Sequence, residues 1–132
     1  MFLIKTYLSK SAIHGLGVFA GEHIPKGTVI SRMAPGFDQV WDLAEFEALP
    51  ELAQDYIQRN GWLNNGKYYM NIDHGLFTNH SRDANVATQP DDSEVAVRDI
   101  AKGEEITCNY TEFNESFDEC PHFEEIRRKG VG

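Results

Sequence analysis

Short runs of apolar and β-branched residues, each bounded by Gly, Pro, Asp or Asn, recur along most of the chain. Runs of this length and composition predict strands rather than helices, because strand side chains alternate between two faces and favour Val, Ile, Thr, Tyr and Phe. The expected strands are Thr6–Leu8, Val18–Ala20, Thr28–Arg32, Lys67–Met70, Val86–Gln89, Glu94–Arg98 and Glu105–Tyr110. The turn residues at positions 90–93 join two of these strands, so residues 86–98 are predicted to form a hairpin.

One segment, from about residue 42 to residue 60, breaks this pattern and predicts helix. Asp42 followed by Glu45 is typical of a helix start, because the two side chains can satisfy free backbone N–H groups there. Pro50 is expected to end a first short helix and to occupy the first turn of a second. Asn60 and Gly61 suit its end. The residues near one face of this second helix are Leu52, Tyr56 and Ile57.

A weak internal repeat has a spacing of 76 residues, since Ala20, Ile24, Lys26, Gly27 and Ile30 recur as Ala96, Ile100, Lys102, Gly103 and Ile106. Each copy is expected to form a strand, a glycine turn and a second strand. Turn chemistry alone could produce this pattern, because Gly supplies the positive φ that a tight turn needs. Two hairpins related by a pseudo-twofold axis are the alternative, and they suit a fold of several small sheets.

The length of 132 residues predicts one domain, spanning residues 1–132 and large enough for its own core. The hydrophobic content of 41% and charged content of 25% are typical of a globular protein. The sequence has no apolar run of the roughly 20 residues that cross a bilayer, so no membrane partner is expected. With only Cys108 and Cys120 present, neither a disulfide framework nor a zinc cluster is expected, which favours a reducing, cytoplasmic setting.

The formal net charge of −9 argues against general nucleic-acid binding, which depends on Lys and Arg. Two interpretations of this acidity stay open. It can steer a basic partner such as a Lys- and Arg-rich peptide, or it can only keep the protein in solution.

Three segments carry candidate chemistry: residues 15–20, with a Gly-Leu-Gly start, residues 77–85, which include Asn79 and His80, and residues 103–110, which end at Tyr110. Glycines let a backbone approach a ligand closely, and an Asn side chain can both donate and accept hydrogen bonds. His74 and His80 lack the further ligand that a metal triad would need. Together and in this order, the segments resemble the three signature motifs of the SET domain, over roughly Tyr7 to Tyr110.

The SET domain transfers a methyl group from S-adenosylmethionine to a protein lysine, leaving S-adenosylhomocysteine. The resemblance implies a mainly β fold, the SET-type β-clip of several small sheets, with a short helical insert at about 42–60. It also implies a knot-like C-terminal crossing near Asn85, followed by a tail at about 111–132. The cofactor-binding residues that it implies are Gly15, Leu16, Gly17, Asn79, His80, Tyr110 and Phe117.

Tyr110 is the implied catalytic residue. Methyl transfer leaves the protein mainly with positioning, and a phenol hydroxyl can orient the amine and favour the transition state electrostatically. The implied walls of the lysine channel are Tyr56, Tyr69, Cys108 and Phe113. Cys108 stands two positions before the tyrosine, where many members carry Phe or Tyr, so the number of methyl groups added stays open.

Other departures from the family pattern are Arg82 in place of Cys and Ala84 in place of Pro, and no Cys-rich segment follows Tyr110. We therefore expect no zinc and a different closure of the lysine channel. The leading hypothesis is a protein-lysine methyltransferase that acts on a lysine in a basic, histone-like segment. The alternative is a catalytically weak SET-like module that binds a basic peptide or the cofactor. A homodimer could add recognition surface, and a eukaryotic host would suggest a nuclear or chromatin-associated location.

Overall fold

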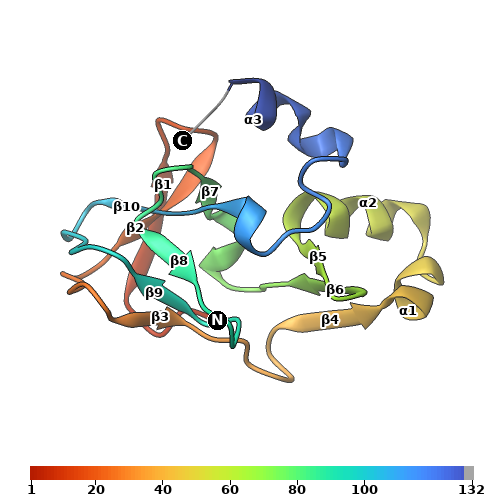
Figure 1. The fold of residues 1–132 in the computed structure, drawn as a ribbon, viewed down its shortest axis with the longest axis horizontal. Coiled ribbons are helices and arrows are strands. Elements are labelled where there is room, and N and C mark those ends of the chain that lie inside the picture. Colours follow the sequence, from red (N-terminus) through yellow and green to blue (C-terminus); the bar gives the residue numbers. More distant parts are fainter. Residues whose placement is uncertain (130–132) are drawn as a thin grey trace.

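The structure is a computed structural model that describes residues 1–129, so residues 130–132, the end of the expected tail, lie outside the described part. Its strands form three small sheets, ordered β1-β2-β10-β7, β3-β9-β8 and β4-β6-β5 (Figure 1). The strands are β1 (Thr6–Lys10), β2 (Leu16–Ala20), β3 (Val29–Ser31), β4 (Gln39–Asp42), β5 (Trp62–Asn64), β6 (Lys67–Met70), β7 (Asn79–His80), β8 (Val86–Thr88), β9 (Glu94–Ala96) and β10 (Glu105–Cys108). The predicted mainly β fold of small sheets is confirmed.

All seven expected strands are present, and β8 and β9 form the expected antiparallel hairpin. The prediction for the last strand was wrong at its end: β10 stops at Cys108, and Tyr110 begins the 3₁₀ turn η2 (Tyr110–Glu112). The Asn109 side chain accepts a hydrogen bond from the N–H of Thr111 at 3.1 Å, which turns the chain out of the sheet. Three short strands, β4, β5 and β7, were not predicted. Strands β4 and β7 pair with segments far along the chain, whereas β5 forms a tight hairpin with β6.

The helical insert contains α1 (Leu43–Glu47) and α2 (Glu51–Asn60). The expected capping box is formed, since the Glu45 N–H donates to Asp42 Oδ1 at 2.7 Å and the Asp42 N–H donates to Glu45 Oε1 at 3.2 Å. Ile57 is buried against the sheet of β4, β5 and β6, whereas Leu52 and Tyr56 are 86% and 51% exposed. Of the three residues expected on the apolar face of this helix, only Ile57 therefore packs into the core. No helix among residues 1–129 is long and apolar enough to cross a membrane.

The remaining short helices are η1 (His74–Phe77), η3 (Pro121–Phe123) and α3 (Glu124–Lys129). Helix η1 leads directly into β7, and η3 and α3 belong to the tail that follows Tyr110. In Figure 1 this tail passes above the insert and ends at α3, at the top of the view.

The internal repeat forms the centre of the main core. Its apolar members are all buried: Ala20, Ile24, Ile30, Ala96, Ile100 and Ile106. Ile24 and Ile100 exchange two backbone hydrogen bonds of 2.8 Å, and the N–H groups of Gly27 and Gly103 donate to the carbonyls of Ala96 and Ala20. These reciprocal bonds are those of a pseudo-twofold arrangement. The two copies do not form separate hairpins, however, because β2 pairs with β10 and β3 pairs with β9.

The expected crossing lies where β10 runs between β2 and β7, antiparallel to the first and parallel to the second. Asn85, which is 2% exposed, holds β10 in place from the side. Its Nδ2 donates to the Glu105 carbonyl at 2.8 Å, and its Oδ1 accepts from the Thr107 N–H at 2.9 Å. Because both bonds are made to backbone groups of β10, they fix where this strand ends and therefore where Tyr110 lies.

Candidate active site

Two cavities meet at Tyr110. The cavity that we name the Cys108 cavity also has Trp62, Phe113 and Glu94 in its wall. The second, named the His80 cavity, is lined by the 13–16 loop together with β7. The residues that line both cavities are Arg59, Asn60, Leu76, Thr78, Tyr110 and Phe123. A ligand in one cavity can therefore approach a ligand in the other beside Tyr110.

Tyr110 is fixed at both ends of the residue. Its hydroxyl donates to the carbonyl of Thr78 at 2.5 Å, and its backbone N–H donates to His80 Nδ1 at 3.0 Å. Burial, together with the nearby acidic groups of Cys108 and Glu105, raises the pKa of the Tyr110 phenol above its ordinary value. The phenol is therefore neutral and keeps its proton on the bond to Thr78.

His80 is buried, 3% exposed, and its ring lies 5.1 Å from that of Tyr110. Because Nδ1 accepts the Tyr110 N–H, the proton of the neutral ring is assigned to Nε2. Burial, with a smaller contribution from the charge of Arg82, lowers the pKa of His80. The ring therefore serves as a neutral brace for the backbone at Tyr110.

Asn79 ties the glycine loop to the sheet. Its Nδ2 donates to the carbonyls of His14 and Leu16 at 3.0 and 3.2 Å, and to Glu105 Oε2 at 3.0 Å. No described residue donates a hydrogen bond to Asn79 Oδ1, and Asn79 lines the His80 cavity. An acceptor is thus available for a ligand at this wall.

The two glycines of the loop have different roles. Gly15 lines the His80 cavity and has a φ of +46°, in the left-handed region that favours glycine. Gly17 lies behind the loop, where a Cβ would overlap Oε2 of Glu105 and approach Ser11. Ser11 and Asn79 both bind the Glu105 carboxylate, so Gly17 leaves the space for the group that holds the loop.

The residues expected at the cofactor lie mostly together. Gly15, Leu16, Asn79, His80 and Tyr110 line the His80 cavity, whereas Gly17 does not. Phe117 is not in that wall either. It packs behind the wall, with its ring 5.0 Å from His80.

The expected channel residues divide into two groups. Cys108 and Phe113 line the Cys108 cavity, whereas Tyr56 and Tyr69 line neither cavity. Tyr69 lies behind the wall of the Cys108 cavity: its ring is stacked on that of Trp62 at 5.7 Å, and Trp62 in turn meets the edge of Phe113 at 5.5 Å. Trp62 was not predicted as a site residue, because a single aromatic residue after a helix carries no functional signal in the sequence.

The tail after Tyr110 closes the site with aromatic side chains. Phe117, Cys120 and Phe123 form a buried cluster, 5–8% exposed, against which Tyr110 packs. The tail is attached to β5 and to the insert: the Glu115 N–H donates to the Leu63 carbonyl of β5 at 2.8 Å, and His122 Nε2 lies 2.9 Å from Oδ1 of Asp55 on α2. Among residues 1–129, no group of three or more His, Cys, Asp and Glu side chains is placed to hold a metal ion. Both cysteines are free and buried.

Comparison with known proteins assigns the family. The SET-domain profile matches residues 15–111, most of the chain, so the chain belongs to the SET-domain family. The crystal structure of a candidate histone methyltransferase of Plasmodium falciparum is similar, with 25% identity and a TM-score of 0.57 over 81% of this chain and 93% of that chain. No curated protein matches the sequence.

A second similar structure is a humanized mutant of the Polycomb Repressive Complex 2 of Chaetomium thermophilum, bound to the inhibitor GSK126. It has 19% identity and a TM-score of 0.62, over 87% of this chain and 16% of that chain, and this likeness is one of fold alone. The family and the first neighbour support, in general terms, a function of the lysine methyltransferase type.

Proposed function

We propose that the protein transfers a methyl group from S-adenosylmethionine to the ε-amine of a lysine in a protein substrate, releasing S-adenosylhomocysteine. The observation that carries the proposal is the meeting of two cavities at Tyr110 and Thr78. The cofactor would occupy the His80 cavity, and the lysine would enter through the Cys108 cavity. The methyl group of the cofactor and the lysine amine would then approach each other in line, each from its own cavity.

The residues of the His80 cavity fit this cofactor. Its volume of about 430 Å³ is in the range of small-molecule sites. Asn79 Oδ1 is free to accept from an ammonium group such as that of the methionine part, and Gly15 allows close approach of the backbone. The cofactor would supply a methyl group activated by a sulfonium.

Tyr110 would orient the attacking amine. Its hydroxyl proton is committed to the Thr78 carbonyl, so the oxygen lone pairs remain to accept an N–H bond from the lysine amine. Held in this way, the amine would direct its own lone pair toward the His80 cavity. Positioning of this kind is the main contribution that a protein can make to a transfer between two bound groups.

The lysine must lose a proton before it can attack, because its ordinary pKa is about 10.4. Enclosure between apolar walls beside a cationic sulfonium would lower that pKa. The walls are provided by Trp62, Phe113 and Phe123. Cys108 is 4% exposed and burial raises its pKa, so it acts there as a small neutral side chain. It leaves room that a Phe or Tyr would fill, which favours acceptance of an amine that already carries a methyl group.

The experiment is transfer of labelled methyl from S-adenosylmethionine to a panel of basic proteins, histones included, by the wild type and two variants. Tyr110→Phe removes the hydroxyl at the junction, and Tyr56→Phe removes one that is exposed on α2 as the matched control. We expect label from the wild type and from Tyr56→Phe, and a loss of about 10²–10³-fold for Tyr110→Phe. Full activity of Tyr110→Phe would refute its role. Cofactor binding by calorimetry without any transfer would instead favour the binding-module alternative.

A further inference from the structure

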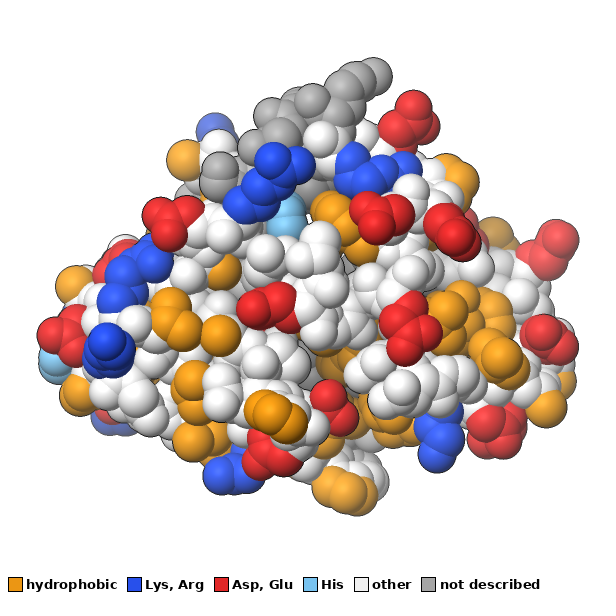
Figure 2. All heavy atoms as spheres, viewed as in Figure 1, with side chains coloured by type: hydrophobic (Ala, Val, Ile, Leu, Met, Phe, Trp, Pro, Cys, Tyr) orange, Lys and Arg blue, Asp and Glu red, His pale blue; other side chains and the backbone are white. Residues whose placement is uncertain are grey.

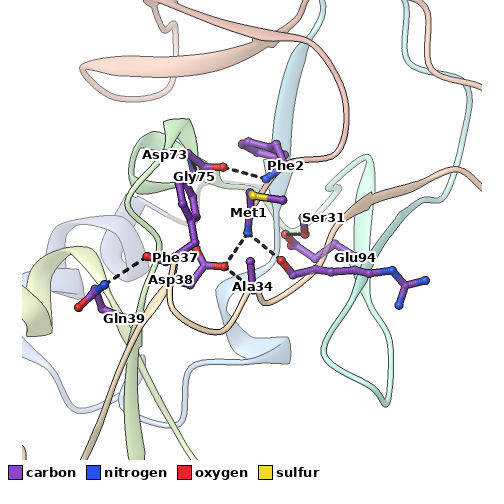
Figure 3. Close-up of polar contacts among 11 residues, drawn as sticks. Met1, Phe2, Ser31, Ala34, Phe37, Asp38, Gln39, Asp73, Gly75 and Glu94 are labelled. Atoms are coloured by element: carbon purple, nitrogen blue, oxygen red, sulfur yellow. Dashed lines mark hydrogen bonds and ion pairs between the residues drawn. The ribbon is translucent and has the colours of Figure 1, made fainter.

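The Cys108 cavity extends from Tyr110 to a second group of polar side chains, on β3, β8 and β9. Ser31, Thr88 and Glu94 all line it. Glu94 is the register partner of both Ser31 on β3 and Thr88 on β8, so the three side chains lie directly across from one another on neighbouring strands. Figure 3 shows two of them, with the Ser31 hydroxyl donating to Glu94 Oε1 at 2.8 Å. We name this group the Glu94 cluster.

One atom of the Glu94 cluster lacks the partner that a buried polar atom normally has, and the Glu94 carboxylate has only one partner. Thr88 Oγ1 is buried and has no hydrogen-bond partner. Glu94 receives a single hydrogen bond, from Ser31, and no described cationic side chain forms an ion pair with it. Burial raises the pKa of this carboxyl, and the Ser31 hydroxyl and the charged amino terminus compensate for the burial only in part.

The cations that border the same cavity are already engaged elsewhere. Arg32 lies 3.6 Å from Asp91, and Arg59 lies 2.8 Å from Asp55. The amino group of Met1 binds Asp38 at 3.0 Å (Figure 3). It also donates to the Arg32 carbonyl at 2.8 Å, and its charge acts on Glu94 without a hydrogen bond to it. The open side of Glu94 is therefore left to a cation that the described residues do not supply.

We propose that the Glu94 cluster binds the guanidinium of an arginine that flanks the target lysine, an inference that rests on the proposed methyl transfer. A guanidinium is planar, presents several N–H donors at once and is weakly hydrated, so it can bind a carboxylate and a hydroxyl together inside a cavity. Glu94 Oε2 and Thr88 Oγ1 would be its acceptors. Asp92, in the turn between β8 and β9, adds negative charge at the same wall.

The enclosed position of Glu94, rather than the net charge of the protein, would give this selectivity. Figure 2 shows acidic side chains scattered over the face in view, between apolar and uncharged ones, without a large continuous acidic area. Scattered exposed charges are screened by salt over about 8–10 Å and select little. An enclosed carboxylate next to the lysine channel is screened much less, so it can specify one residue at a fixed spacing from the lysine.

The test uses short, otherwise neutral peptides that each hold one lysine and one arginine, with the arginine moved along either side of the lysine. Glu94→Gln keeps the shape and the acceptor for Ser31 but removes the charge, and Thr88→Val removes the unpaired hydroxyl. Glu47→Gln, on the exposed part of α1, is the matched control. Two quantities are measured: kcat/KM for methyl transfer, and binding of the same peptides with norleucine in place of lysine, by fluorescence anisotropy.

We expect arginine at one position to raise kcat/KM and affinity about tenfold or more in the wild type and in Glu47→Gln. Glu94→Gln should lose this gain, so that its own kcat/KM and affinity become the same with and without the arginine at every position. An arginine preference that survives in Glu94→Gln, or no preference at any position, overturns the inference. If no peptide is methylated, the proposed function fails on these substrates, and the anisotropy series alone decides whether the Glu94 cluster binds arginine.

Discussion

Asn85 offers a direct test of how the site is assembled. Asn85→Ala would remove both side-chain bonds to β10 and leave the Glu105 carbonyl and the Thr107 N–H without partners in a region where Asn85 is 2% exposed. Each buried polar group left without a partner costs about 1–3 kcal/mol, so we expect a loss of about 2–6 kcal/mol in the free energy of unfolding. This is a large part of the roughly 5–15 kcal/mol that stabilises a typical domain.

Asn85→Asp would keep one of these two hydrogen bonds and remove the other. One carboxylate oxygen can still accept the Thr107 N–H, whereas the other would face the Glu105 carbonyl without a proton to donate. Burial would raise the pKa of this new carboxyl above its unfolded value of about 3.9. The folded state would therefore hold the proton more tightly than the unfolded chain does. The loss in the free energy of unfolding relative to the wild type should be small at acid pH and should grow as the pH rises through the folded pKa.

Urea unfolding of the wild type and both variants, followed by tryptophan fluorescence over a range of pH, measures these differences. If Asn85→Ala costs less than about 1 kcal/mol, the bonds do not have the role assigned to them. A deficit of Asn85→Asp that does not depend on pH would also refute the reasoning, because a carboxyl buried against a carbonyl must show linkage.

Three further predictions concern the site itself. Gly17→Ala should displace the Glu105 carboxylate and weaken binding of S-adenosylmethionine, measured by calorimetry, with a smaller effect on the unfolding midpoint. Phe117→Ala, at a position 6% exposed beside Tyr110, should cost about 3–5 kcal/mol in urea unfolding and lower methyl transfer as the tail loosens. Because the pKa of His80 is lowered from 6.5, the unfolded chain takes up its proton first as the pH falls below that value. Stability should therefore decrease from about pH 6.5 downward, and His80→Gln should remove this part of the slope in pH-dependent unfolding.

The sequence by itself determined the local structure. The turn at residues 90–93, the capping pair Asp42 and Glu45, and the stop at Gly61 all occur where the sequence predicts them. Local signals of this kind depend on the dihedral preferences and hydrogen bonds of a few consecutive residues, so they can be read without the fold. The three motifs and their order along the chain determined the family, and the structure brings five of the seven cofactor-binding residues implied by the resemblance to one cavity.

Only the tertiary structure decided which strands pair and which side chains face a ligand. The repeat is visible in the sequence, but the exchange that pairs β2 with β10 and β3 with β9 is not, because strand pairing joins residues far apart in the chain. Strand β7 has only two residues, and it is a strand because it pairs with β10. The exposure of Tyr56 follows from how α2 lies on its sheet through Ile57.

The Glu94 cluster also could not be predicted from the sequence. Ser31, Thr88 and Glu94 are ordinary polar residues at strand ends, and nothing in their local sequence indicates a binding group. Strand register brings them together, and enclosure leaves Thr88 Oγ1 without a partner and Glu94 with only one. Burial and missing partners are properties of the folded chain, because they depend on which surfaces the other segments cover.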